Sequence, residues 1–153
     1  MPIVPSRSRR IQELLGRLAS PLAAERDSAV AGLTLLGPRV LEPLRAFLPG
    51  AARPARLAAV EVLERIEDRG ALPLLLELSR DGDEAVSRRA IQAAGAIPDP
   101  RAVSGLAALV APPAPAQRRS AAARALARLA RGRVEALDVL VARLLDEREE
   151  AGL

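Results

Sequence analysis

Residues 83–103 read DEAVSRRAIQAAGAIPDPRAV, and this stretch decides the fold. Asp83 is a typical N-cap residue, and the apolar residues that follow it recur at helical spacing, so we expect a helix from Asp83 to Ile97. Asp99-Pro100 then combines an N-cap residue with a proline at the first helical position, where no backbone N–H is needed. The stretch therefore predicts one helix, a short joint and the start of a second helix.

Similar helix pairs recur about every 30 to 32 residues along the chain. The clearest copies span 26–48, 56–78, 88–109 and 119–140, and we expect Val30, Val60, Ile91 and Ala123 to occupy equivalent core positions, as do Leu33, Leu63, Ala94 and Leu126. Pro43 and Pro73 also match, each near the first turn of a second helix. A fixed period of this length is typical of stacked helical repeats, which bury a continuous core between neighbours.

Composition supports an all-α chain. Half of the 153 residues are hydrophobic, yet there is one Phe, one Met and no Trp or Tyr, so small and aliphatic side chains must fill the core. Strands favour β-branched and aromatic residues that alternate with polar ones, and the chain has few such residues and no sustained alternation. We expect an irregular arm over 1–7, a single repeat domain over 8–150 and a short tail over 151–153, with the proline-rich residues 111–115 forming a stiff loop inside the domain.

The unit at 83–103 resembles the short HEAT-like repeats, of the type also found in phycobilisome lyases, and the resemblance extends over about residues 8–150. It implies an all-α fold, an α-solenoid (superhelix) of about four and a half HEAT-like helix-pair repeats. It further implies that the first helix of each pair, starting near residues 22, 53, 83 and 116, lines the concave face. Because such arrays serve many purposes, the resemblance predicts the fold far more sharply than the function.

Nothing in the sequence has the pattern of an active site. The chain has no His and no Cys, which leaves no general base that titrates near neutral pH and no thiol nucleophile or thiolate metal ligand. The acidic cluster Asp81, Asp83 and Glu84 is interpreted as the cap of a helix rather than as a metal site. The prediction is a protein without catalytic, cofactor-binding or metal-binding residues, and with no cofactor.

Arginine is the residue type that points to a binding surface. Six arginines near the third and fourth repeats are the candidate partner-binding residues: Arg88, Arg118, Arg119, Arg124, Arg128 and Arg131. Arg124, Arg128 and Arg131 share one helix face by their spacing. Two other interpretations stay open. Arginines that recur at helix starts (Arg26, Arg56, Arg88 and Arg119) could form a ladder that pairs with neighbouring units, and the remainder could be a solvated basic face.

The net charge of +4 is mild for 23 basic and 19 acidic residues, and all 23 basic residues are Arg, a bias typical of a GC-rich genome. We therefore predict a non-catalytic protein–protein interaction scaffold that binds a protein or peptide on its concave face. The alternative is sequence-nonspecific binding of a nucleic-acid phosphate backbone by the fourth repeat. Base recognition is disfavoured because no Trp, Tyr or His is present to stack on a base. With no apolar run long enough to span a membrane, a cytoplasmic location is expected, and the oligomeric state stays open.

Overall fold

The computed structural model describes residues 6–131 and 134–150, with side chains placed over 6–131 and 138–146. The described residues are helical and contain no strand, which confirms the all-α prediction. The expected tail lies outside them, as does most of the expected arm. Within the described residues, no helix is both long and apolar enough to cross a membrane.

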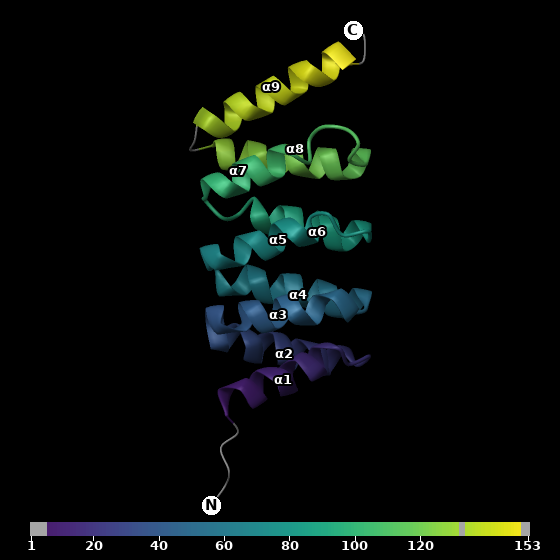
Figure 1. The fold of residues 1–153 in the computed structure, drawn as a ribbon, viewed down its shortest axis with the longest axis vertical. Helices are drawn as coiled ribbons and strands as arrows, with labels where there is room; N and C mark the ends of the chain where they lie inside the picture. Colours follow the sequence, from purple (N-terminus) through teal and green to yellow (C-terminus); the bar gives the residue numbers. More distant parts are fainter. Residues whose placement is uncertain (1–5, 132–133, 151–153) are drawn as a thin grey trace, which may run out of the picture. The chain divides into compact units, whose positions relative to one another are not determined.

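By its internal contacts the chain divides into two compact units, Met1–Leu74 and Leu75–Leu153, and each is described by itself. The single domain expected over 8–150 stays a prediction. In both units the helices lie one upon another in chain order, as stacked repeats require (Figure 1).

The first unit is built around α2, which packs against both α1 and α4. Its elements are α1 (Arg7–Leu18), α2 (Ala23–Leu36), η1 (Gly37–Val40), α3 (Leu41–Phe47), η2 (Leu48–Gly50), α4 (Arg53–Ile66) and η3 (Arg69–Ala71), followed by the start of α5 (Leu72–Leu78). Val30 and Leu33 of α2 and Val60 and Leu63 of α4 are buried, as their spacing predicts. Pro43 and Pro73 lie in the first turns of α3 and α5, also as predicted.

The second unit repeats this plan, with α6 packed against α8 and with α7 and α8 packed against α9. Its helices after α5 are α6 (Glu84–Ala94), α7 (Pro100–Ala107), α8 (Ala116–Ala130) and α9 (Val134–Glu150). Direct packing of α6 on α8 brings the first helices of two successive repeats side by side, and this juxtaposition positions the candidate site.

Two acidic N-caps form as the sequence predicts. Oδ1 of Asp83 accepts hydrogen bonds from the backbone N–H groups of Ala85 and Val86, at 3.0 and 3.1 Å. Oδ1 of Asp99 accepts from the N–H of Arg101 at 2.8 Å, and its Oδ2 accepts from the Arg101 guanidinium at 2.9 Å. The hydrogen bond to Asp99 and the attraction of its charge raise the pKa of Arg101 above its ordinary value.

Two helix boundaries differ from the prediction. The helix expected to start near residue 22 begins at Ala23, because Ser20 Oγ accepts from the N–H of Leu22 and holds a turn there. The helix expected to reach Ile97 ends at Ala94, and Gly95 follows it as the C-cap. A Cβ at Gly95 would lie 2.7 Å from Cβ of Ala125, so α8 passes very close to the end of α6.

In the fourth repeat, one of the two expected core positions is confirmed and the other is shifted by one residue. Leu126, the expected equivalent of Ala94, is completely buried, as predicted. Ala122 is also completely buried, whereas Ala123, the expected equivalent of Ile91, is half-buried. Residues 31 positions after Ile91 and Ala94 are buried as well, which gives the buried pairs Val30/Leu33, Val60/Leu63, Ile91/Ala94 and Ala122/Ala125. In this register Arg26, Arg56, Ser87 and Arg118 are equivalent, each four residues before the first buried residue of its pair.

Candidate functional site

Two adjoining hollows lie between the N-terminal halves of α6 and α8, with volumes of about 230 and 330 Å³. Both are lined by Glu84, Arg88 and Gln117. The first is completed by Gly82, Ser87, Pro115 and Arg118, and the second by Ala116, Ser120 and Arg124. We call the two hollows together the α6–α8 groove. Three of the six arginines predicted to bind a partner (Arg88, Arg118 and Arg124) thus share one groove.

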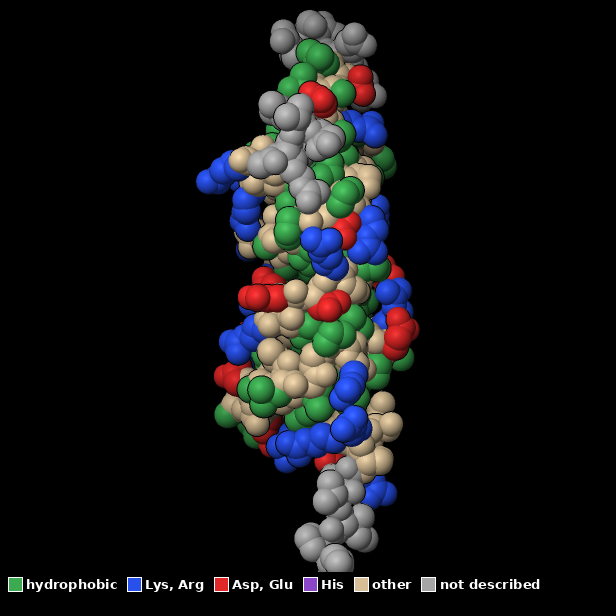
Figure 2. Space-filling view, turned by 90° about the vertical axis from the view of Figure 1, so that its left-hand side faces the viewer, with side chains coloured by type: hydrophobic (Ala, Val, Ile, Leu, Met, Phe, Trp, Pro, Cys, Tyr) green, Lys and Arg blue, Asp and Glu red, His purple; other side chains and the backbone are tan. Residues whose placement is uncertain are grey.

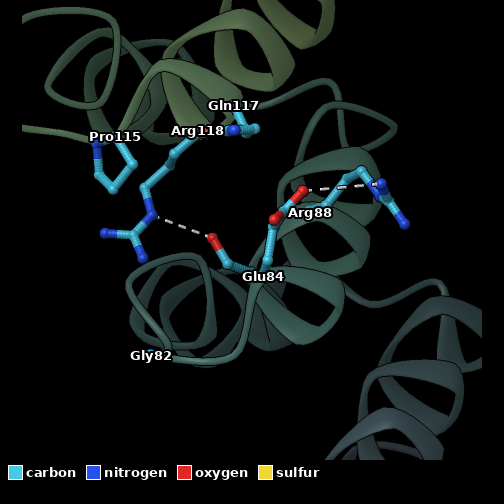
Figure 3. Close-up of a pocket in the computed structure, with 7 residues that line it drawn as sticks. Gly82, Glu84, Arg88, Pro115, Gln117 and Arg118 are labelled. Carbon is cyan, nitrogen blue, oxygen red and sulfur yellow. Dashed lines mark hydrogen bonds and ion pairs between the residues drawn. The ribbon is translucent and has the colours of Figure 1, made fainter.

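Arg118 fixes one end of the groove. It extends from α8 to α6, where its Nε donates to Ser87 Oγ at 3.1 Å (Figure 3). Its NH2 donates to the carbonyl oxygen of Asp81 at 2.7 Å. These bonds join the fourth repeat to the third, but Arg118 is not one of the arginines expected to form a ladder. Of those, Arg26 donates to the carbonyl oxygens of Ser20 and Pro21 and Arg119 to that of Ala114, each just before its own helix. Since the guanidinium already serves two protein acceptors, Arg118 has fewer N–H groups left for a partner.

Ser87 connects this arginine to a third segment. Its side chain is almost fully buried, and its Oγ donates to the carbonyl oxygen of Ser79 at 2.7 Å while accepting from Arg118. Ser79 is itself buried, and its Oγ donates to the carbonyl oxygen of Leu75. The end of α5, the start of α6 and the start of α8 are therefore joined by one chain of hydrogen bonds.

Arg88 and Arg124 are the groove arginines whose guanidinium N–H groups can still donate hydrogen bonds to a partner. Arg88 NH1 lies 3.9 Å from Glu84 Oε1, one turn earlier on the same helix, and Figure 3 shows Glu84 turned toward it. At that distance the two side chains form an ion pair but no hydrogen bond. Arg124 is exposed and has no hydrogen-bond or ion-pair partner among the described residues.

The other three candidates lie outside the groove. Arg119 NH1 donates to the carbonyl oxygen of Ala114 at 3.0 Å, in the loop that precedes its own helix. Arg128 lies exposed in the last turn of α8 and Arg131 is the exposed C-cap residue of that helix. The structure thus distributes the six arginines over a groove, a loop contact and the end of a helix.

Charges of both signs are interspersed elsewhere on the surface. Figure 2 shows one face on which Arg and acidic side chains alternate with apolar and neutral ones. The acidic cluster before α6 is occupied with backbone contacts: Asp83 caps α6, and Asp81 Oδ1 accepts from the N–H of Asp83 at 2.8 Å. The predicted cap is therefore confirmed for Asp83, while Asp81 holds the turn before it. In the part of the chain that the structure describes, no three potential ligand side chains come together as a metal site would need.

Sequence reasoning missed Glu84, Gln117 and Ser120 as lining residues of the groove. Glu84 was assigned to the helix cap alone, and Gln117 and Ser120 carry no charge to attract notice. A usable signal was the 31-residue separation of Ser87 and Arg118, which places both at the same position of successive repeats. Residues one period apart on adjacent first helices are expected to face each other.

Comparison with known proteins agrees with this architecture. No curated protein sequence matches the chain significantly. The family model for HEAT repeats matches residues 41–127, which cover most of α3 to α8. HEAT repeats generally mediate protein–protein interactions and are typically non-catalytic. With stacked helix pairs of regular period and a match over more than half of its length, this chain belongs to the HEAT-repeat family.

Proposed function

We propose that this chain is a non-catalytic interaction scaffold and that its protein partner docks on the face formed by α6 and α8. The α6–α8 groove carries the proposal, because one concavity holds the weakly paired Arg88 and Arg124, which has no partner among the residues that the structure describes. Arginine is well suited to such a surface, since its planar guanidinium binds carboxylates through two parallel hydrogen bonds. The helices that form the groove are those expected to line the concave face of the array.

Arg128 and Arg131 extend the basic surface beyond the groove along α8. We propose that they attract an acidic partner from a distance rather than hold it, because exposed charges act mainly on the rate of association. A cytoplasmic location and a GC-rich genome stay predictions from the sequence.

Affinity capture with the purified chain tests this function. Bound material is collected with and without nuclease and at low and high salt, and the double variant Arg124→Glu/Arg128→Glu is compared with wild type. Arg119 is left intact because it holds the loop at Ala114. Arg17→Glu is the control for each single charge reversal, since Arg17, like Arg128, is exposed in the last turn of its helix. It changes the net charge half as much as the double variant does.

A partner protein that survives nuclease treatment, is lost with the double variant and is kept by Arg17→Glu supports the scaffold. Bound material that absorbs strongly at about 260 nm and leaves as salt rises would show phosphate-backbone binding instead. The chain has no Trp or Tyr, so its own absorbance does not obscure this signal. Equal capture by wild type and the double variant would place the docking surface elsewhere.

A further inference from the structure

We propose that the α6–α8 groove receives a carboxylate side chain of an acidic peptide segment, and that Glu84 occupies the place of that carboxylate in the free protein. The proposal rests on the scaffold function and specifies what the groove recognises. Arg88 and Arg124 hold the incoming carboxylate, and Glu84 competes with it from within the chain.

The arginines of the groove differ in how many donors they keep. Arg118 Nε donates to Ser87 Oγ at 3.1 Å, and its NH2 donates to the carbonyl oxygen of Asp81 at 2.7 Å. With these donors engaged, Arg118 forms a wall of the groove. Arg124 has no partner in the described residues, and Arg88 has only the 3.9 Å contact with Glu84. A guanidinium has five N–H donors in a rigid fork, and an acceptor with two oxygens satisfies it best.

Glu84 already shows that a carboxylate fits beside Arg88. Both hollows are lined by Glu84, so this residue lies where the two meet. The Glu84 and Arg88 side chains are 63 and 56% exposed, and their oxygen and nitrogen are too far apart for a hydrogen bond. Exposed pairs of this kind contribute little, so a better-placed carboxylate can replace Glu84.

The groove suits a peptide better than a nucleic-acid backbone. Gln117 and Ser120 line it with neutral hydrogen-bonding groups, and Pro115 and Ala116 add apolar surface. A peptide uses all of these, since it carries N–H and C=O groups and methylene stems besides its carboxylates. A nucleic acid would find no Trp, Tyr or His in the sequence on which a base could stack.

Fluorescence anisotropy with two labelled peptides tests the proposal on the full chain. One peptide carries six Glu residues between Gly-Ser flanks, and the other carries six Gln residues in the same frame. We expect the Glu peptide to bind at low salt at least about tenfold more tightly than the Gln peptide, the change expected from losing one charge-assisted hydrogen bond. Arg124→Gln should weaken binding of the Glu peptide by about tenfold.

The decisive variant is Glu84→Gln, which should bind the Glu peptide about threefold or more tightly than wild type because the competing carboxylate is gone. Glu42→Gln is the matched control: Glu42 lies 3.8 Å from Arg45 in an exposed pair of the first unit, and its replacement changes the net charge equally. Far-UV circular dichroism verifies that each variant is folded.

Several results would overturn the proposal. These are equal binding of the Glu and Gln peptides, unchanged binding by Arg124→Gln, or an affinity of Glu84→Gln no higher than that of Glu42→Gln. A labelled single-stranded oligonucleotide that binds more tightly than the Glu peptide, and competes with it, would show a general polyanion surface. If the Glu peptide fails while affinity capture still depends on Arg124 and Arg128, the scaffold stands and only its ligand class is wrong.

Discussion

Nε of Arg118 lies 3.1 Å from Oγ of Ser87, a residue 31 positions earlier in the chain, and this bond joins equivalent positions of two successive repeats. The same guanidinium also binds the carbonyl oxygen of Asp81, so one side chain of α8 holds both the loop before α6 and the first turns of that helix. Arg118 was predicted to be a partner-binding residue, and its contacts point to a structural role.

Arg118→Ala should therefore lower the free energy of unfolding by about 1–3 kcal/mol, because it removes two partly buried hydrogen bonds from a charged donor. Arg124→Ala, at an exposed position without a partner in the described chain, should change it by less than about 0.5 kcal/mol. Urea unfolding followed by circular dichroism measures both. Equal changes in unfolding free energy for the two variants would contradict a structural role for Arg118.

The close approach of α6 and α8 makes a second prediction. Gly95→Ala would place a Cβ 2.7 Å from Cβ of Ala125 and 3.1 Å from its Cα, so the helices must separate. We expect a loss of about 1–3 kcal/mol in unfolding free energy, as for other overpacked cores. Adding Ala125→Gly should recover part of this loss by restoring the space, whereas Ala125→Gly alone destabilises. If the double variant lost more unfolding free energy than the two single variants together, the packing argument would be contradicted.

At Gly37 the backbone conformation determines how much a substitution destabilises the fold. Its φ of 64° and ψ of −146° lie in a region essentially reserved for glycine, and a Cβ there would meet no atom within 4 Å. Gly37→Ala should thus cost about 1–3 kcal/mol through backbone strain alone. Gly50→Ala is the control, because a Cβ there also meets nothing within 4 Å and φ is not positive. Thermal denaturation of the two variants should separate them clearly.

The N-cap of α7 can be tested by two substitutions of one residue. Asp99→Ala removes the acceptor for the N–H of Arg101 and should destabilise by about 1 kcal/mol. Asp99→Asn keeps a side-chain oxygen that can cap the helix, so it should cost less.

The interaction of Asp99 with Arg101 also bears on how stability depends on pH. Because Asp99 raises the pKa of Arg101, the stabilisation that comes from this shift is present below the ordinary pKa of arginine. It is lost only as pH rises through the still higher pKa of the folded state. Wild-type stability should consequently show no transition from this arginine between about pH 6 and 9.

Peptide binding should also be independent of pH over that range. The groove cations are arginines, which stay charged, and the chain has no His to titrate. Affinity for the Glu peptide should fall as pH drops through about 4, where the ligand's own carboxylates become protonated. Anisotropy titrations across pH measure this. A midpoint between about pH 6 and 8 would be inconsistent with recognition by guanidinium groups alone.

Much of the fold could be predicted because acidic caps and prolines mark the starts of several helices. Asp83 and Asp99-Pro100 begin α6 and α7 where the sequence indicated. Ala123 was expected in the core instead of Ala122 because Ala121, Ala122 and Ala123 are identical, so no larger side chain distinguishes the buried position. The end of α6 was missed because the approach of Ala125 to Gly95 depends on packing between helices.

The site was only partly predictable for a similar reason. The sequence identified the arginines, but not which of them would be engaged by the protein itself. Arg118 and Arg119 are adjacent, yet one reaches the previous repeat and the other contacts its own loop. That difference follows from the direction in which each side chain leaves the helix, which spacing along the chain does not specify.

The Glu84–Arg88 pair has a consequence for the rate of partner exchange. Both residues are exposed on one helix, a single turn apart, so displacing Glu84 requires rotation of side chains and no movement of the backbone. Such rotations take picoseconds to nanoseconds at exposed positions, far less time than the encounter of two molecules. Association at this groove would then be limited by diffusion and steering, and the lifetime of the complex by how many carboxylates the partner offers in succession. A scaffold of this kind would release one acidic segment and accept the next without opening its fold.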